Sequence, residues 1–134
     1  MLVTTMATEA QAAPMVRFSR AQYNSPGADN RTNYSLNQEY VRVTNYSRTT
    51  TYRLTSWTIR DRENHVYRFP AFALRPGRSV TLHTGRGANT ATDLYWNSRA
   101  YIWNNTGDVA SLRTSSGSLD DTCRWGNGAG SVAC

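Results

Sequence analysis

The sequence lacks several features that mark common classes of protein. No run approaches the roughly 18 apolar residues that a membrane-spanning helix requires, so no segment is predicted to cross a membrane. It contains only two cysteines and two histidines. The two cysteines are not accompanied by a second Cys pair or a His pair at the spacing of zinc ligands, which argues against a zinc site. The alanine, leucine, glutamate and lysine richness of long helices is also missing. We therefore predict no metal centre, no cofactor and an all-β chain.

Lysine is absent altogether, and all 15 basic residues are arginines, which leave a formal net charge of +6. These arginines are dispersed, whereas nucleic-acid binders usually concentrate basic residues in a patch or an arm. The dispersed charge favours the interpretation that these arginines are ordinary surface residues. Alternating strands can still assemble a patch from scattered positions, so a polyanion-binding sheet face is the alternative. Its candidate residues lie in consecutive predicted strands or their turns: Arg42, Arg53, Arg60, Arg68 and Arg78.

A chain of 134 residues suits a single domain that buries roughly two-thirds of its unfolded surface. Eight tyrosines, four tryptophans and three phenylalanines give it high β propensity. In the segment EYVRVTNYS, Val41 and Val43 alternate with polar residues, as in a half-buried strand. About eight such strands, with turns roughly every 8 to 12 residues, predict a β-sandwich or barrel. The predicted strands cover residues 16–23, 39–47, 51–60, 66–72, 79–84, 92–96, 100–103, 109–114 and 116–125.

Three local predictions complete this outline. Residues 24–37 are rich in turn formers and are expected to form a long loop. The segment RPGR should form a type II turn, because Pro76 presets φ and Gly77 permits a positive φ. Trp57 lies between Leu54 and Ile59 and is predicted to be buried.

Cys123 and Cys134 are the only cysteines, and their spacing predicts a local disulfide. In the chain-entropy model a loop of this length is stabilised by about 3 kcal/mol, and the C-terminal tail would be held against the body of the domain. A disulfide also indicates an oxidising compartment, so we expect an extracellular, secreted protein.

The N-terminal segment carries a further indication of export. Residues 1–13 have no basic region and no complete apolar core, so they are not an intact signal peptide. They contain Ala10-Gln11-Ala12, the small-x-small pattern of a cleavage site. We expect residues 1–13 to be the remnant of a secretion signal or a disordered N-terminus, and residues 14–134 to form the domain.

Several segments, taken in order, resemble the lamin tail domain, and specifically the bacterial secreted branch of that family. They are SLNQEYVRVTN, LTSWTIRD, HVYRFPAFALRPGRSVTLHTGRG, TDLYW and WNNTGDVASLR. The resemblance covers Val16 to Trp125 and implies an immunoglobulin-like β-sandwich without enzymatic activity of its own. In lamins the domain is an interaction module on a coiled-coil rod, with contacts to proteins and DNA. This chain has no heptad-bearing rod and no nuclear-localisation run, so a nuclear filament role does not carry over.

The loop segment WNNTGD is the main candidate for ligand contact. Its asparagines, glycine and aspartate favour a structural turn, and a single carboxylate is too little for a good calcium site. Trp96 and Trp103 bracket a short loop and are the best candidates for an exposed platform that stacks sugars or bases, although core or edge packing is favoured even there. The candidate binding residues are Trp96, Trp103, Asn104, Asn105, Asp108, His83 and Arg86.

One cluster has the composition of an acid–base or metal site. Asp61, Glu63 and His65 would share a face if extended, and His83 could join them in an enzyme or metalloprotein. The cluster lies in a predicted turn, where charged residues are usual. We therefore predict no enzyme but a secreted interaction module that binds a protein or cell-envelope polymer through its loops. A nucleic-acid or other polyanion binder is the alternative.

Overall fold

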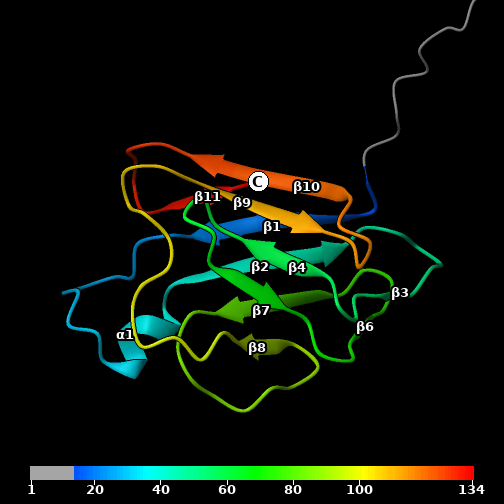
Figure 1. The fold of residues 1–134 in the computed structure, drawn as a ribbon, viewed down its shortest axis with the longest axis horizontal. Helices are drawn as coiled ribbons and strands as arrows, with labels where there is room; N and C mark the ends of the chain where they lie inside the picture. Colours follow the sequence, from blue (N-terminus) through cyan, green and yellow to red (C-terminus); the bar gives the residue numbers. More distant parts are fainter. Residues whose placement is uncertain (1–13) are drawn as a thin grey trace, which may run out of the picture.

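Two β-sheets pack face to face in the computed structural model, which describes residues 14–134 (Figure 1). The larger sheet has the strand order β11-β1-β2-β7-β8, and all its pairs are antiparallel except β7 with β8. Its strands are β1 (Val16–Gln22), β2 (Tyr40–Asn45), β7 (Ser79–His83), β8 (Asp93–Tyr95) and β11 (Ser131–Ala133). The expectation for residues 1–13 falls outside the described residues.

The second sheet has four antiparallel strands in the order β10-β9-β4-β5. A small two-stranded sheet joins β3 to β6, and one short helix, α1, follows the first strand. These elements are β4 (Thr58–Arg60), β5 (Val66–Arg68), β9 (Asp108–Arg113), β10 (Leu119–Trp125), β3 (Tyr52–Arg53), β6 (Ala73–Leu74) and α1 (Asn33–Asn37). The predicted all-β, immunoglobulin-like sandwich of one domain is confirmed. Within residues 14–134 no helix is long and apolar enough to span a membrane.

The core lies between the sheets and is filled by alternate residues of the strands. Val41 and Val43 of β2 are buried at 0% and 1% exposure, while their neighbours in the strand stay partly exposed. Ile59 and Leu112 of the facing sheet are also fully buried in the same cluster. The period-two pattern predicted for β2 is therefore confirmed, because a half-buried strand turns every second side chain inward. Trp57 packs against this core but is only partly buried, so the prediction that it is buried is wrong.

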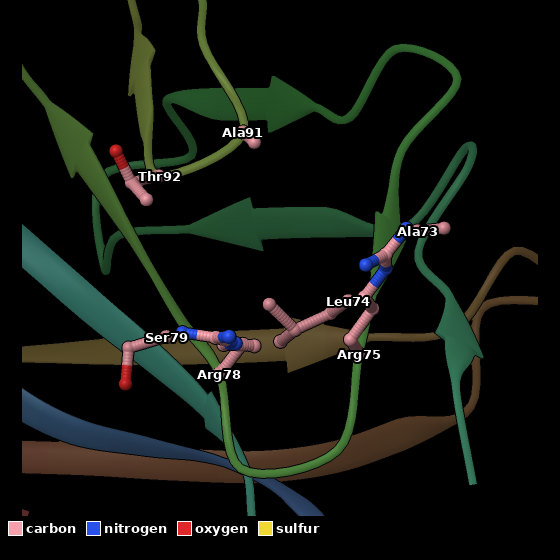
Figure 2. A pocket seen from close by; sticks show the side chains of 7 residues that line it. All are labelled: Ala73, Leu74, Arg75, Arg78, Ser79, Ala91 and Thr92. Carbon is pink, nitrogen blue, oxygen red and sulfur yellow. The ribbon is translucent and has the colours of Figure 1, made fainter.

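The segment RPGR forms the predicted turn between β6 and β7 (Figure 2). Gly77 has a φ of 71°, which a type II turn requires at that position and glycine adopts without strain. Asn45, fully buried at the end of β2, holds the turn in place. Its N–H donates to the Arg78 carbonyl at 2.9 Å, its carbonyl accepts the Gly77 N–H at 2.9 Å, and its side-chain amide donates to the Leu74 carbonyl at 2.9 Å.

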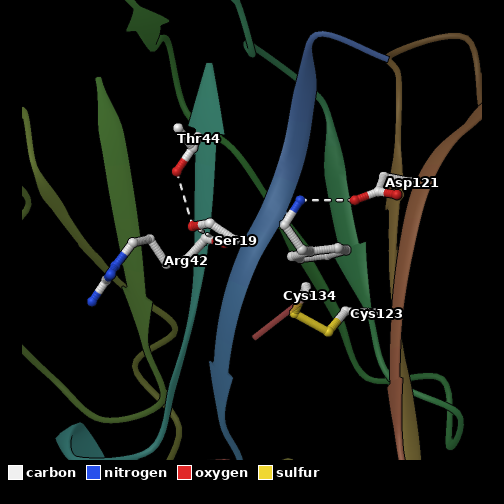
Figure 3. Close-up of a disulfide and its surroundings, with 7 residues drawn as sticks. Ser19, Arg42, Thr44, Asp121, Cys123 and Cys134 are labelled. Atoms are coloured by element: carbon white, nitrogen blue, oxygen red, sulfur yellow. Dashed lines mark hydrogen bonds between the residues drawn. A yellow bond between two sulfur atoms is a disulfide. The ribbon is translucent and has the colours of Figure 1, made fainter. Parts of the chain in front are cut away.

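The predicted disulfide is present and joins the two sheets (Figure 3). Cys123 lies in β10 of the four-stranded sheet, and Cys134 follows β11 of the five-stranded sheet, with 5.4 Å between their Cα atoms. Close by, the Phe18 N–H of β1 donates to the Asp121 carboxylate of β10 at 2.8 Å. The C-terminal tail is therefore attached to the body, as predicted, by a covalent bond as well as by pairing of β11 with β1.

Three predictions of local structure are wrong. Residues 51–60 are not one strand: Ser56 has a φ of 66°, and the chain there passes from β3 to β4, in a different sheet. Residues 100–103 form no strand, because backbone N–H groups there donate to a buried carboxylate instead of to a ladder. The long loop at 24–37 contains α1, whose N-cap Thr32 accepts the Ser35 N–H at 3.2 Å.

Candidate functional site

The loop cavity is a polar hollow at the end of the sandwich where β1 ends and β2 begins. Two long connections meet there, one between β1 and β2 and the other between β8 and β9 (Figure 1). They enclose about 220 Å³. The lining residues are Asn24, Ser25, Asp29, Glu39, Tyr101, Trp103, Asn104, Asn105 and Thr106.

Glu39 anchors one wall of the loop cavity. Its side chain is 1% exposed, and one oxygen, Oε1, accepts the N–H groups of Ile102 at 2.8 Å and Trp103 at 3.3 Å and the Thr84 hydroxyl at 2.7 Å. Burial raises the pKa of this carboxyl to about 7; the three hydrogen bonds oppose the rise, and the charge of Asp29 adds to it. One carboxyl group therefore ties together three segments of chain and titrates near neutral pH.

Asp108 fixes the other end of the same loop. It is fully buried, and its Oδ1 accepts the N–H groups of Arg62 at 2.9 Å and Val109 at 2.8 Å. Its Oδ2 accepts the Asn104 N–H at 3.0 Å, and the Trp125 indole N–H donates to the Asn104 carbonyl at 2.8 Å. Asp108 therefore serves as the acceptor of a tight turn; it is fully buried and is not among the residues that line the cavity.

The tryptophans proposed as an exposed platform belong to a packed aromatic row. Trp103 is only 3% exposed, and its ring meets Trp96 edge-on at 6.0 Å and Trp125 edge-on at 5.6 Å between centroids. Tyr23 stacks on Trp125 at 4.9 Å, and Trp96 contacts Tyr67. Trp103 is therefore not an exposed platform, and the core packing that the sequence favoured is observed: Glu39 accepts its N–H, and edge-to-face contacts bury the ring. Trp96 is partly buried and does not line the cavity.

His83 and Arg86 lie outside the loop cavity. His83 is on the outer face of the five-stranded sheet, where Nε2 lies 2.7 Å from Asp93 Oδ1 and Nδ1 donates to the Asn37 carbonyl at 2.8 Å. The Thr92 hydroxyl and then His83 hold the pKa of Asp93 below its usual range. Arg86 is exposed, and its backbone is held by α1.

Close packing explains why glycine stands on either side of Arg86. A Cβ at Gly85 would lie 2.5 Å from the Asn37 side chain, and one at Gly87 would lie 2.5 Å from the Tyr95 ring. Both contacts are too short for any larger residue unless the neighbour moves. The HTGRG segment therefore forms a connection that packs closely against α1 and β8.

The loop cavity thus brings together Trp103, Asn104 and Asn105 from the predicted set. Sequence reasoning missed most of its other lining residues, above all Glu39. No local pattern marks Glu39, because a charged residue directly before a strand is normally exposed and its burial here depends on N–H groups more than sixty positions away. The Asn24–Asp29 segment was recognised only as turn-forming, which does not show what it packs against.

The five arginines of the predicted polyanion face do not share a face. Arg42 lies on the outer side of the five-stranded sheet, whereas Arg60 and Arg68 lie on the outer side of the four-stranded sheet. Arg53 belongs to the two-stranded sheet, and Arg78 ends the RPGR turn. The prediction of one face is wrong, because β2, β3 and β4 belong to three different sheets and only Arg60 and Arg68, on the paired strands β4 and β5, lie on one face.

The arginines nevertheless share one electrostatic property. All 15 fall within residues 14–134, where the ion pairs closer than 4.0 Å involve His65 and His83 but no arginine. Arg75 and Arg78 also line a second cavity, of about 520 Å³ (Figure 2). In the described part of the chain, the surface therefore carries positive charge that no carboxylate within 4.0 Å neutralises.

The acid–base cluster is built into a turn. Asp61 is 4% exposed; its Oδ1 accepts the His65 N–H at 2.7 Å, and its Oδ2 lies 2.6 Å from His65 Nδ1. This contact raises the pKa of His65. Glu63 accepts the Asn104 side-chain amide, and His83 belongs to the other sheet. In the part of the chain that the structure describes, no three His, Cys, Asp or Glu side chains are grouped to hold a metal.

Comparison with known families supplies an independent finding. A family model described as Lamin Tail Domain matches residues 9–127. The matched range contains β1 to β10 and both cavities, whereas β11 and Cys134 lie beyond it. No curated protein matches the chain.

Proposed function

Because the chain belongs to the lamin tail domain family, a family of non-enzymatic immunoglobulin-like domains, we propose that it is an extracellular binding module without catalysis. Its partner is a protein or a cell-envelope polymer, and the loop cavity is the contact site. Loops on a rigid sandwich are the usual place for recognition, since the scaffold holds them in position.

The observation that carries this proposal is that buried carboxylates hold the backbone around the loop cavity in place. Glu39 and Asp108 together accept five backbone N–H groups around residues 102–109 and 62. A loop held so firmly loses little conformational entropy when a ligand binds. Side-chain amides and hydroxyls of Asn24, Asn105 and Thr106 then offer donors and acceptors to a polar partner.

Two features support an extracellular location. The Cys123–Cys134 disulfide needs oxidising surroundings to persist. The Ala10-Gln11-Ala12 pattern suits signal cleavage, and we propose that the mature protein begins near Ala13 and that residues 14–134 form its domain. N-terminal sequencing of exported protein tests this; retention of residues 1–12 would contradict it.

Removal of polar groups from the rim of the cavity tests the binding site. The double variant Asn105→Ala/Thr106→Ala changes two exposed residues, neither of which makes a side-chain hydrogen bond within the described chain. We expect affinity for isolated cell-envelope polymer, or for an identified protein partner, to fall by roughly tenfold or more. The control Thr49→Ala/Thr51→Ala removes exposed hydroxyls from the β2–β3 connection. Equal affinity of both variants and the parent would remove the cavity from the proposal.

A second candidate function is polyanion binding, favoured by the absence of any arginine–carboxylate pair in residues 14–134. If it holds, affinity for duplex DNA or heparin falls steeply as salt rises, with a slope set by the number of phosphates or sulfates neutralised. Absence of binding even at low salt would exclude it.

A further inference from the structure

We propose that the cavity between the RPGR turn and the start of β8 is a binding site for one oxyanion group, a carboxylate or phosphate, carried by a partner molecule. We call it the arginine cavity; it is lined by Ala73, Leu74, Arg75, Arg78, Ser79, Ala91 and Thr92 and encloses about 520 Å³. It lies where β7 and β8 begin, at the end of the sandwich opposite the loop cavity (Figure 1). Failure of this site would therefore leave the proposed function intact.

The walls of the arginine cavity are fixed by backbone hydrogen bonds. Asn45 holds the turn that carries both arginines, as described above, and the Arg78 N–H donates to the Arg75 carbonyl at 3.1 Å. Across the cavity, the Thr92 carbonyl accepts the Thr81 N–H of β7 at 2.9 Å. Figure 2 shows Arg78 and Ser79 on one side and Ala91 and Thr92 on the other. The backbone that carries the two exposed arginine side chains is thus fixed, which lowers the part of the entropy cost of binding that comes from ordering the chain.

The free donors in this cavity are the guanidinium groups. Among the hydrogen bonds of residues 14–134, none uses the side chain of Arg75 or Arg78, and neither forms an ion pair there. The hydroxyls on the walls are already engaged: Thr92 donates to Asp93 at 2.6 Å, and Ser79 bonds Thr44 at 2.7 Å. A guanidinium offers a planar fork of N–H groups that fits two oxygens of a carboxylate or phosphate.

Charge and polarity around the cavity favour an anion over a cation. No acidic residue lines it. Asp93 follows Thr92 in the chain, but both of its oxygens are occupied, Oδ1 with His83 and Oδ2 with Thr92. Leu74, 1% exposed, and the methyl groups of Ala73 and Ala91 form an apolar lining. The site therefore suits an oxyanion attached to a slim apolar group.

The test is a titration of the full chain followed by the arginine Nε–Hε resonances in NMR spectra. The probes are inorganic phosphate, acetate and butyrate, each added at constant ionic strength with chloride as the reference. We expect the Arg75 and Arg78 resonances to shift and saturate together. Butyrate should bind more tightly than acetate because of the apolar lining, whereas tighter binding of phosphate than of either would identify a phosphate ligand.

Three variants separate a shaped site from general positive charge. Arg75→Gln/Arg78→Gln should weaken binding about tenfold or more, and Arg75→Lys/Arg78→Lys should also weaken it although the charge is kept. The control Arg62→Gln/Arg124→Gln removes the same charge from exposed positions elsewhere and should leave affinity unchanged. The inference is overturned if shifts are linear and similar at all arginines, or if the lysine variant binds as well as the parent.

Discussion

Replacing Glu39 by glutamine is expected to stabilise the protein above neutral pH and to leave its stability nearly unchanged in mild acid. Glutamine keeps a carbonyl oxygen that can accept the same three hydrogen bonds, from Thr84, Ile102 and Trp103. It removes the group that becomes charged when the carboxyl loses its proton. The variant therefore isolates the cost of placing a carboxylate in this buried position.

The size of the effect follows from the pKa of Glu39. Folding raises that pKa from 4.5 to about 7, so the folded protein holds the proton more tightly than the unfolded chain. The stability contributed by this group is fully present below about pH 4.5, falls as the pH rises from there to about 7, and is then lost. A shift of this size corresponds to about 3 kcal/mol at 1.36 kcal/mol per pKa unit. The difference between variant and parent should thus grow from near zero at about pH 4.5 to about 3 kcal/mol above pH 7.

The assay is urea unfolding, followed by tryptophan fluorescence, over a series of pH values with the disulfide intact. The free energy of the parent is subtracted from that of the variant at each pH, because Asp120, whose pKa burial raises to about 6, titrates in both proteins and cancels. Glu63→Gln removes an exposed carboxylate near the same loop and should change stability far less than about 3 kcal/mol across the series, since its charge acts only as one of the smaller causes of the raised pKa of His65. Parallel stability curves for parent and Glu39→Gln would refute the reasoning.

Three further changes test the structure. Asp108→Ala leaves three partly buried backbone N–H groups without their acceptor and should lower the free energy of unfolding by about 3 kcal/mol, measured by urea unfolding. Reducing the Cys123–Cys134 disulfide should cost about 3 kcal/mol and shift the urea midpoint with reductant; an unchanged midpoint would contradict the role assigned to it. Gly87→Ala should lower the melting temperature, because its Cβ would press on an aromatic ring at a cost of about 1–3 kcal/mol, whereas Gly126→Ala enters open space and should not.

The sequence was informative where structure is decided by neighbouring residues. Val41 and Val43 alternate with polar residues, and the strand they predict is present. Gly77 after a proline predicts a turn with positive φ, and the turn is there. In each case the residues that determine the conformation lie within a few positions of one another.

The sequence was misleading where distant residues decide. Residues 51–60 contain no proline or glycine to mark a break, yet Ser56 takes a positive φ because the chain passes to another sheet. Residues 100–103 have strand-like composition, but the N–H groups of Ile102 and Trp103 donate to Glu39, more than sixty positions away. Burial of Glu39 depends on that distant contact, so no local pattern could identify the loop cavity.

The placement of charges explains how a net positive surface arises from a modest excess of basic residues. Within the part of the chain that the structure describes, four carboxylates accept backbone N–H groups: Glu39, Asp61, Asp108 and Asp121. Within residues 14–134 none of the acidic groups approaches an arginine within 4.0 Å, so the arginine charge stays on the surface. A surface of net positive charge is expected to attract polyanions at low salt in general, so salt dependence alone would not distinguish attraction from recognition. Recognition needs oriented N–H groups, and exchange of arginine for lysine tests for them because it keeps the charge and removes the planar fork.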